Sequence, residues 1–132
     1  MQNGPNAPNQ NAAAPAGNQV SSAQPTLGEV CQITSLVQLQ TIIKNYAGVI
    51  IDFYSPTCPP CMRFKPIYEA QARANRNKRI VFCAVECNAN REAAQAFQVQ
   101  SIPQFNFILN EEQSDKFVGA DEHKFRQALG KL

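Results

Sequence analysis

Hydrophobic positions follow two alternating periods along the chain from Leu27 onward. Short runs of β-branched and aromatic residues predict strands, and the segments between them repeat apolar residues at helical spacing. The predicted strands are 29–33, 49–54, 80–86, 104–109 and 114–118. The predicted helices are 36–48, 58–77, 91–97 and 121–132. The order β-α-β-α-β-α-β-β-α indicates an α/β fold.

Two local signals refine this pattern. Ser35 is followed three residues later by Gln38, a combination typical of a helix start, and Gly48 is the predicted end of that helix. The run 49–54 lacks polar alternation except for Asp52, which is typical of a central strand covered on both faces. Asp52 is therefore expected to be buried.

The N-terminal region has a different composition from the rest. Residues 1–25 contain no charged residue and consist mostly of Asn, Gln, Ala and Pro. Such a segment cannot bury enough apolar surface to offset its chain entropy. We predict a disordered tail over residues 1–26 and one globular domain over residues 27–132.

Charge and hydropathy exclude several classes of protein. A net charge of +2 is too mild for a nucleic-acid-binding surface. No apolar run approaches the roughly 18 residues of a membrane-spanning helix, and the N-terminus has neither the basic nor the apolar part of a secretion signal. The first basic residue is Lys44, whereas organelle transit peptides are rich in arginine. We expect a cytoplasmic protein that binds neither membranes nor nucleic acids.

The cysteines point to a reducing compartment. An odd number without a secretion signal argues against a structural disulfide framework. The five are Cys31, Cys58, Cys61, Cys83 and Cys87. Three of them, Cys31, Cys83 and Cys87, are expected to act as small buried hydrophobic residues, with Cys87 at its strand end the candidate for an exposed thiol.

The candidate chemistry lies in Cys58-Pro59-Pro60-Cys61, where a buried strand gives way to a helix. The free N–H groups and positive end of that helix stabilise a thiolate at Cys58, which we therefore expect to be the nucleophile. Cys61 lies one turn further in, within disulfide range and more buried, and is expected to be the resolving thiol.

A C-x-x-C pair can also be half of a zinc site, with Cys83 and Cys87 as the other half. In an extended strand, however, the Cα atoms of those two residues are ~13 Å apart, too far to share one metal ion. We therefore expect a redox dithiol with no metal and no bound cofactor.

Five motifs together resemble the thioredoxin family over about residues 27–132. They are Ile51-Asp52-Phe53-Tyr54, Cys58-Pro59-Pro60-Cys61, Pro66, Ile102-Pro103 and Val118-Gly119-Ala120. The resemblance implies the thioredoxin fold, a central mixed β-sheet of about five strands flanked by four helices. It also implies a monomeric protein-disulfide reductase that acts on disulfide-containing proteins in cell redox homeostasis and electron transport, recycled by an NADPH-dependent thioredoxin reductase.

The resemblance also assigns roles to single residues. Asp52 is the family's buried acid, which assists proton transfer at the resolving thiol. Pro103 corresponds to the cis-proline that lets the backbone of Ile102 pair with an extended substrate. The implied substrate-binding residues are Thr57, Pro59, Pro60, Ile102, Pro103 and Gly119.

Four positions depart from the family pattern. Pro59 replaces a glycine, Thr57 a tryptophan and Met62 a common lysine, so the reduction potential and substrate range stay open. Ala84 falls where some bacterial thioredoxins carry a lysine that interacts with the buried acid, so Asp52 is expected to have no buried cationic partner.

Three alternative functions remain. The domain could be an interaction module whose tail or basic face binds a partner. A glutaredoxin would share the fold, but the glycine pair that this family uses for glutathione near the last helix is absent from the sequence. A more oxidising oxidase or isomerase is open because the residues between the cysteines tune the potential.

Overall fold

The computed structural model describes residues 24–132, and most of the predicted tail lies outside these residues. Every predicted strand and helix is present, in the predicted order. The strands are β2 (Val30–Gln32), β3 (Gly48–Tyr54), β4 (Ile80–Glu86), β5 (Gln104–Leu109) and β6 (Glu112–Val118). The helices are α1 (Leu36–Asn45), α2 (Pro59–Ala74), α3 (Arg91–Ala96) and α4 (Glu122–Leu129).

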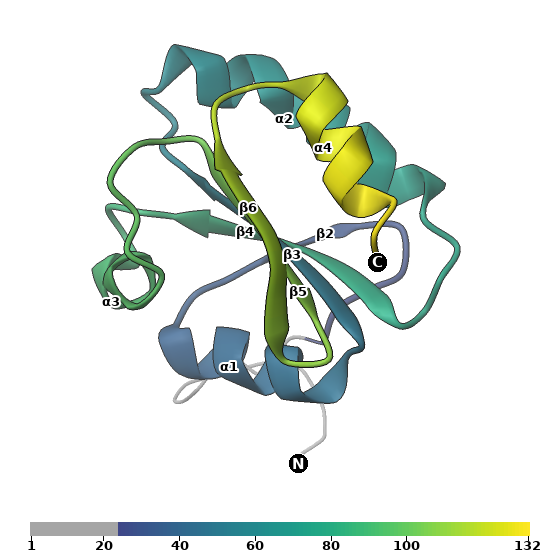
Figure 1. Ribbon diagram of the computed structural model, residues 1–132. Helices are drawn as coiled ribbons and strands as arrows, with labels where there is room; N and C mark the ends of the chain where they lie inside the picture. The colour runs from purple at the N-terminus through teal and green to yellow at the C-terminus, as the bar shows by residue number, and fades with distance from the viewer. Residues whose placement is uncertain (1–23) are drawn as a thin grey trace.

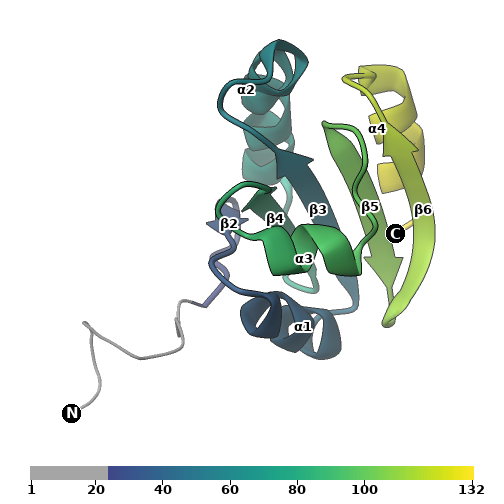
Figure 2. The ribbon, with the colours of Figure 1, turned by 90° about the vertical axis from the view of Figure 1, so that its left-hand side faces the viewer.

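The five strands form one mixed sheet in the order β2-β4-β3-β5-β6. β2 and β3 both pair with β4 in parallel, and β5 is antiparallel to β3 and to β6. β2 and β6 are the two edges (Figure 2). The central strands β3 and β4 are buried along nearly their whole length, as their unbroken apolar runs predict.

Helices cover both faces of this sheet (Figure 1). On one face, α1 and α3 pack on a mainly aliphatic cluster built around Leu39, Ile51 and Val85. On the other face, α2 and α4 enclose an aromatic cluster of Phe64, Tyr68, Phe82, Phe105, Phe107 and Phe125. The Tyr68 hydroxyl donates to the buried carbonyl of Cys83 at 2.6 Å, which fixes α2 over β4.

The predicted helix starts are confirmed by their caps. The Ser35 side chain accepts a hydrogen bond from the Gln38 N–H (3.1 Å), and Asp121 does the same for Lys124 (3.0 Å). Each bond satisfies one of the backbone donors that a helix start leaves free.

Several predicted ends were wrong. α1 ends at Asn45, not near Gly48, which instead begins β3. A Cβ at Gly48 would lie 3.1 Å from Ile80 Cγ1, so packing against β4 favours glycine there. α2 ends at Ala74 rather than 77 because Asn75 leaves the helix and its amide donates to the Ile80 carbonyl (3.0 Å).

The last hairpin and the last helix also differ in length. β6 starts at Glu112, two residues earlier than predicted, because Asn110 and Glu111 alone form the turn. Both have positive φ angles of 52° and 70°, as a tight hairpin turn with primed geometry requires. α4 ends at Leu129 instead of 132. Within residues 24–132, no helix has the length and apolar character needed to span a membrane.

Candidate active site

The two cysteines of the C-x-x-C motif are joined by a disulfide at the start of α2, with their Cα atoms 5.2 Å apart. Cys58 is the N-cap residue, and its backbone N–H donates to the Ser55 carbonyl at 3.1 Å. Pro59 and Pro60 occupy the first helical positions, where a missing N–H costs nothing and the fixed φ suits a helix. The prolines thus hold Cys58 at the positive end of α2.

The surroundings of the two sulfur atoms differ. The Cys61 backbone N–H donates to Cys58 Sγ at 3.3 Å, and Cys58 is half-buried. Cys61 is only 2 % exposed. A negative charge on Cys58 would be stabilised by this donor and by the helix end, whereas Cys61 has neither the exposure nor the helix-end position.

The segment before β5 lies against the cysteines. Cys58 Sγ is 3.9 Å from the carbonyl oxygen of Ile102, and the Ile102–Pro103 peptide bond is cis, as the family resemblance implies. The Gly119 N–H donates to the Pro103 carbonyl at 2.8 Å. Gly119 has a φ of +113°, a conformation that favours glycine. Residues from two loops distant in sequence therefore meet at Cys58.

The remaining predicted substrate-binding residues lie on the rim of this site. Thr57 and Pro59 are exposed, and Pro60 is half-buried. The Thr57 hydroxyl lies 3.0 Å from the buried Ser55 hydroxyl, which anchors the loop between β3 and α2.

Asp52 is buried on β3, on the face of the sheet that α2 covers. The residue is only 7 % exposed, and its Oδ1 atom has no hydrogen-bond partner among the described residues. Burial raises the pKa of Asp52 to about 7, because the ionised form is poorly solvated there. Asp52 and Cys61 line the same cavity of about 140 Å³.

Other residues of this cavity were not predicted. Tyr54 and Gln32 line it, and the Gln32 amide donates to the Tyr54 hydroxyl at 2.9 Å. Strand alternation could have placed Tyr54 on the Asp52 face, two residues along β3. Gln32 could not have been found that way because its position depends on how β2 pairs with β4.

Two residues of this cavity, Ala84 and Lys65, bear on whether Asp52 has a cationic partner. Ala84 lines the cavity, where it supplies only a methyl group. Lys65 also lines it, but its ammonium group is bonded to Glu69 at 2.8 Å on the surface. None of the buried polar side chains in residues 24–132 is cationic.

The cysteines outside the motif match their predicted environments. Cys31 and Cys83 are buried free thiols in the core, and Cys87 is a half-buried one at the end of β4. Cys31 and Cys83 are also direct neighbours across β2 and β4.

Comparison with known proteins gives one consistent result. The thioredoxin family model matches residues 30–131. A thioredoxin from Ictalurus punctatus is 26% identical over 102 residues, which are 76% of this chain and 95% of that protein. The solved thioredoxin of Fasciola hepatica is 29% identical with a TM-score of 0.71, over 76% of this chain and 97% of its own. The solved Malassezia sympodialis thioredoxin is 26% identical with a TM-score of 0.73, over 86% and 97%.

Proposed function

The chain belongs to the thioredoxin family of thiol–disulfide oxidoreductases, and from this premise we propose that it reduces the disulfides of other proteins with Cys58 and Cys61. The thiol–disulfide chemistry follows from the family and from the Cys58–Cys61 pair. The direction of the reaction and the roles of single residues are our proposal.

In the first step, the Cys58 thiolate attacks one sulfur of a substrate disulfide. A mixed disulfide forms, and the other substrate sulfur leaves as a thiolate. The observation that carries this assignment is the position of Cys58 Sγ at the start of α2, where the Cys61 N–H donates to it at 3.3 Å. A half-buried sulfur stabilised in this way combines access with thiolate character.

In the second step, Cys61 releases the substrate. Its thiol loses a proton, and the resulting thiolate attacks Cys58 Sγ, so that the second substrate sulfur leaves and the Cys58–Cys61 disulfide forms. Two electrons have then passed to the substrate. We assign the proton to Asp52, because the two residues share a cavity and a pKa of about 7 suits a group that must both accept and release a proton.

The substrate lies across the exposed rim of the site. We assign its extended backbone to Ile102, whose carbonyl is next to Cys58 Sγ, and place Pro103 and Gly119 beneath it. Thr57, Pro59 and Pro60 flank the reacting sulfur. The two prolines between the cysteines give this rim apolar surface, which favours substrates with apolar residues beside their disulfide.

The wider role follows from the same chemistry. The family generally acts with thioredoxin reductase, so we propose an NADPH-dependent enzyme of that kind as the electron donor. Three free thiols among the described residues favour a reducing compartment, for which we propose the cytoplasm. The family match beginning at residue 30 supports a domain over residues 27–132. We further propose that this domain acts as a monomer in electron transport and cell redox homeostasis.

A trapping experiment tests this mechanism. Cys61→Ser should leave the attack by Cys58 intact but block release, so that mixed disulfides with substrate proteins accumulate on a non-reducing gel. Cys58→Ser should trap almost nothing, because Cys61 is buried.

The half-buried thiol of Cys87 supplies a matched control, because it could form mixed disulfides unrelated to the mechanism. Cys61→Ser combined with Cys87→Ser should trap the same proteins as Cys61→Ser alone. If Cys61→Ser traps nothing, or if both active-site variants trap equally, the assigned roles are wrong and an interaction module becomes the better explanation.

A further inference from the structure

Two buried thiols lie side by side on the face of the sheet opposite Asp52. Cys31 of β2 and Cys83 of β4 are register partners on neighbouring parallel strands. Both belong to the core cluster beneath α1, and both are free. They are 9 % and 0 % exposed. Hydrophobic packing alone does not require a thiol at both positions of a strand pair.

A buried amide is aimed at one of them. Gln38 of α1 is only 5 % exposed. Its Oε1 accepts from the Thr34 backbone N–H at 2.7 Å and from the Thr34 hydroxyl at 3.2 Å. This fixes the orientation of the amide, so that Nε2 points at Cys31 Sγ, 3.9 Å away. The only polar group that Gln38 offers to the core is thus a donor directed at a sulfur.

The spacing of the strands selects what could lie between the two thiols. Neighbouring strands are about 4.7–4.9 Å apart, so two side chains that leave them in parallel can hold their sulfurs at a similar separation. An ion held in line by two metal–thiolate bonds, taken at the zinc–thiolate length of about 2.3 Å, needs sulfurs roughly 4.6 Å apart. A disulfide would need sulfurs at about 2 Å and Cβ atoms at about 3.5–4.5 Å, which would require the strands to move.

We propose that Cys31 and Cys83 form a binding site for one soft monovalent cation of the Cu(I) class, held between the two sulfurs with the Gln38 amide beside it. On binding, each thiol gives a proton to solvent and two sulfur–metal bonds form, with no electron transferred. Thiolates select soft ions. Among residues 24–132, no group of three or more His, Cys, Asp or Glu could hold a metal, so the four ligands that Zn²⁺ prefers are not assembled.

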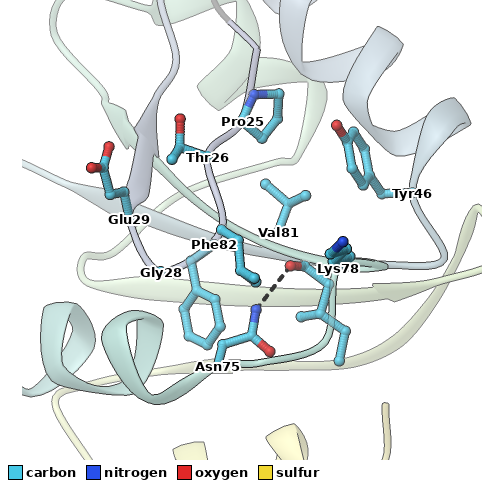
Figure 3. Close-up of a pocket in the computed structure, with 11 residues that line it drawn as sticks. Pro25, Thr26, Gly28, Glu29, Tyr46, Asn75, Lys78, Val81 and Phe82 are labelled. Carbon is cyan, nitrogen blue, oxygen red and sulfur yellow. Dashed lines mark hydrogen bonds between the residues drawn. The ribbon is translucent and has the colours of Figure 1, made fainter.

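The pair lies beside one edge of the sheet. β2 is a three-residue edge strand that pairs only with β4, so its displacement breaks few hydrogen bonds. A cavity of about 250 Å³ lies beside the segment that enters β2 (Figure 3). It is lined by Glu29 and by Val81, which lies two residues before Cys83 on β4. Glu29, two residues before Cys31 in the chain, adds an acidic side chain to this cavity, which neither cysteine lines.

Competition for Cu(I) tests the proposal on the full-length, reduced protein. Cys58→Ser/Cys61→Ser removes the active-site dithiol, which would itself bind soft metals. Under anaerobic conditions, this variant should withdraw one Cu(I) per chain from the coloured bicinchoninate complex, and X-ray absorption should show two sulfur ligands. Adding Cys31→Val, Cys31→Ala or Cys83→Ala should abolish the withdrawal, and adding Cys87→Ser should leave it unchanged.

Two substitutions are used at Cys31, which lies on an edge strand, so that at least one variant folds, and circular dichroism identifies which variants are folded. A folded Cys31 variant that still withdraws one Cu(I) would overturn the proposal. So would the absence of withdrawal by Cys58→Ser/Cys61→Ser, or recovery of a Cys31–Cys83 disulfide without bound metal by mass spectrometry.

Discussion

Asp52 of β3 lies directly opposite Ala84 of β4 in the parallel register, so a buried carboxylate faces a methyl group across the strand pair. Both residues line the cavity that Cys61 shares. Nothing in that register position can neutralise the carboxylate, and its Oδ1 is left without a hydrogen bond in the described structure. The fold therefore retains a destabilising group beside the resolving thiol.

Removing this charge should stabilise the protein at neutral pH. The Asp52 pKa is about 7 in the fold against an ordinary value of 3.8, so between these two values the folded state binds more protons than the unfolded state. Stability from this group is greatest below pH 4 and is lost as the pH rises to 7. Asp52→Asn does not titrate, so its gain should be small near pH 4 and reach up to roughly 4 kcal/mol above pH 7.

Urea unfolding of the oxidised protein at pH 4.5 and pH 8 measures this difference. Asp52→Asn should also release substrate from the mixed disulfide with Cys58 more slowly, because Cys61 loses its proton acceptor. A gain in stability that is equal at both pH values would show that folding does not raise the pKa of Asp52.

The sequence predicts the central strands well and the ends of helices poorly, for physical reasons. The limits of β4 and β5 are as predicted, because β4 is an almost unbroken apolar run and the aromatic residues of β5 alternate with Gln104 and Asn106. The end of α2 is set by the bond from Asn75 to the Ile80 carbonyl. That contact forms only once β4 is in place, and no local sequence pattern predicts it.

The active site divides in the same way. Cys58 and Cys61 follow from a local motif at a strand-to-helix transition. The contact between Cys58 and Ile102, however, follows only from the family resemblance, because two distant loops must meet. The pairing of Cys31 with Cys83 was not predicted at all, since it depends on the register between β2 and β4.

The reactivity of Cys58 should depend on pH in a way that a free thiol does not. In the reduced protein, its alkylation by iodoacetamide should have a midpoint well below the ~8.5 of a free thiol, because the helix end and the Cys61 N–H stabilise the anion. Burial raises the pKa of Cys87, so Cys58→Ser should leave only slow alkylation with a high midpoint. A Cys58 midpoint at or above the free value would remove the basis for naming it the nucleophile.

The proposed domain boundary predicts how much of the N-terminus can be deleted. The described core begins at Cys31, and the family match begins at residue 30. Removal of residues 1–26 should therefore change the melting temperature by no more than about 2 °C and leave disulfide reduction intact. Removal of residues 1–32, which takes β2 as well, should lower it by many degrees. A large drop already with the shorter deletion would mean that the domain extends further toward the N-terminus.

An ammonium group placed opposite Asp52 should reverse the effect of burial. Ala84→Lys puts a cation on the neighbouring strand, at the register position of Asp52 and on the wall of their shared cavity. An opposite charge at that range typically lowers a carboxyl pKa by roughly 1–3 pH units, so the Asp52 pKa should fall from about 7 toward its ordinary value. Carboxyl ¹³C NMR against pH measures the Asp52 pKa directly.

Ala84→Met, of similar length but uncharged, controls for filling the cavity and should leave the titration midpoint of Asp52 near 7 or raise it. Ala84→Lys combined with Asp52→Asn should be the least stable of these variants, because the buried ammonium then has no partner. If Ala84→Lys and Ala84→Met give the same Asp52 midpoint, the introduced ammonium group does not interact with Asp52. The residue at position 84 would then not control the pKa of Asp52.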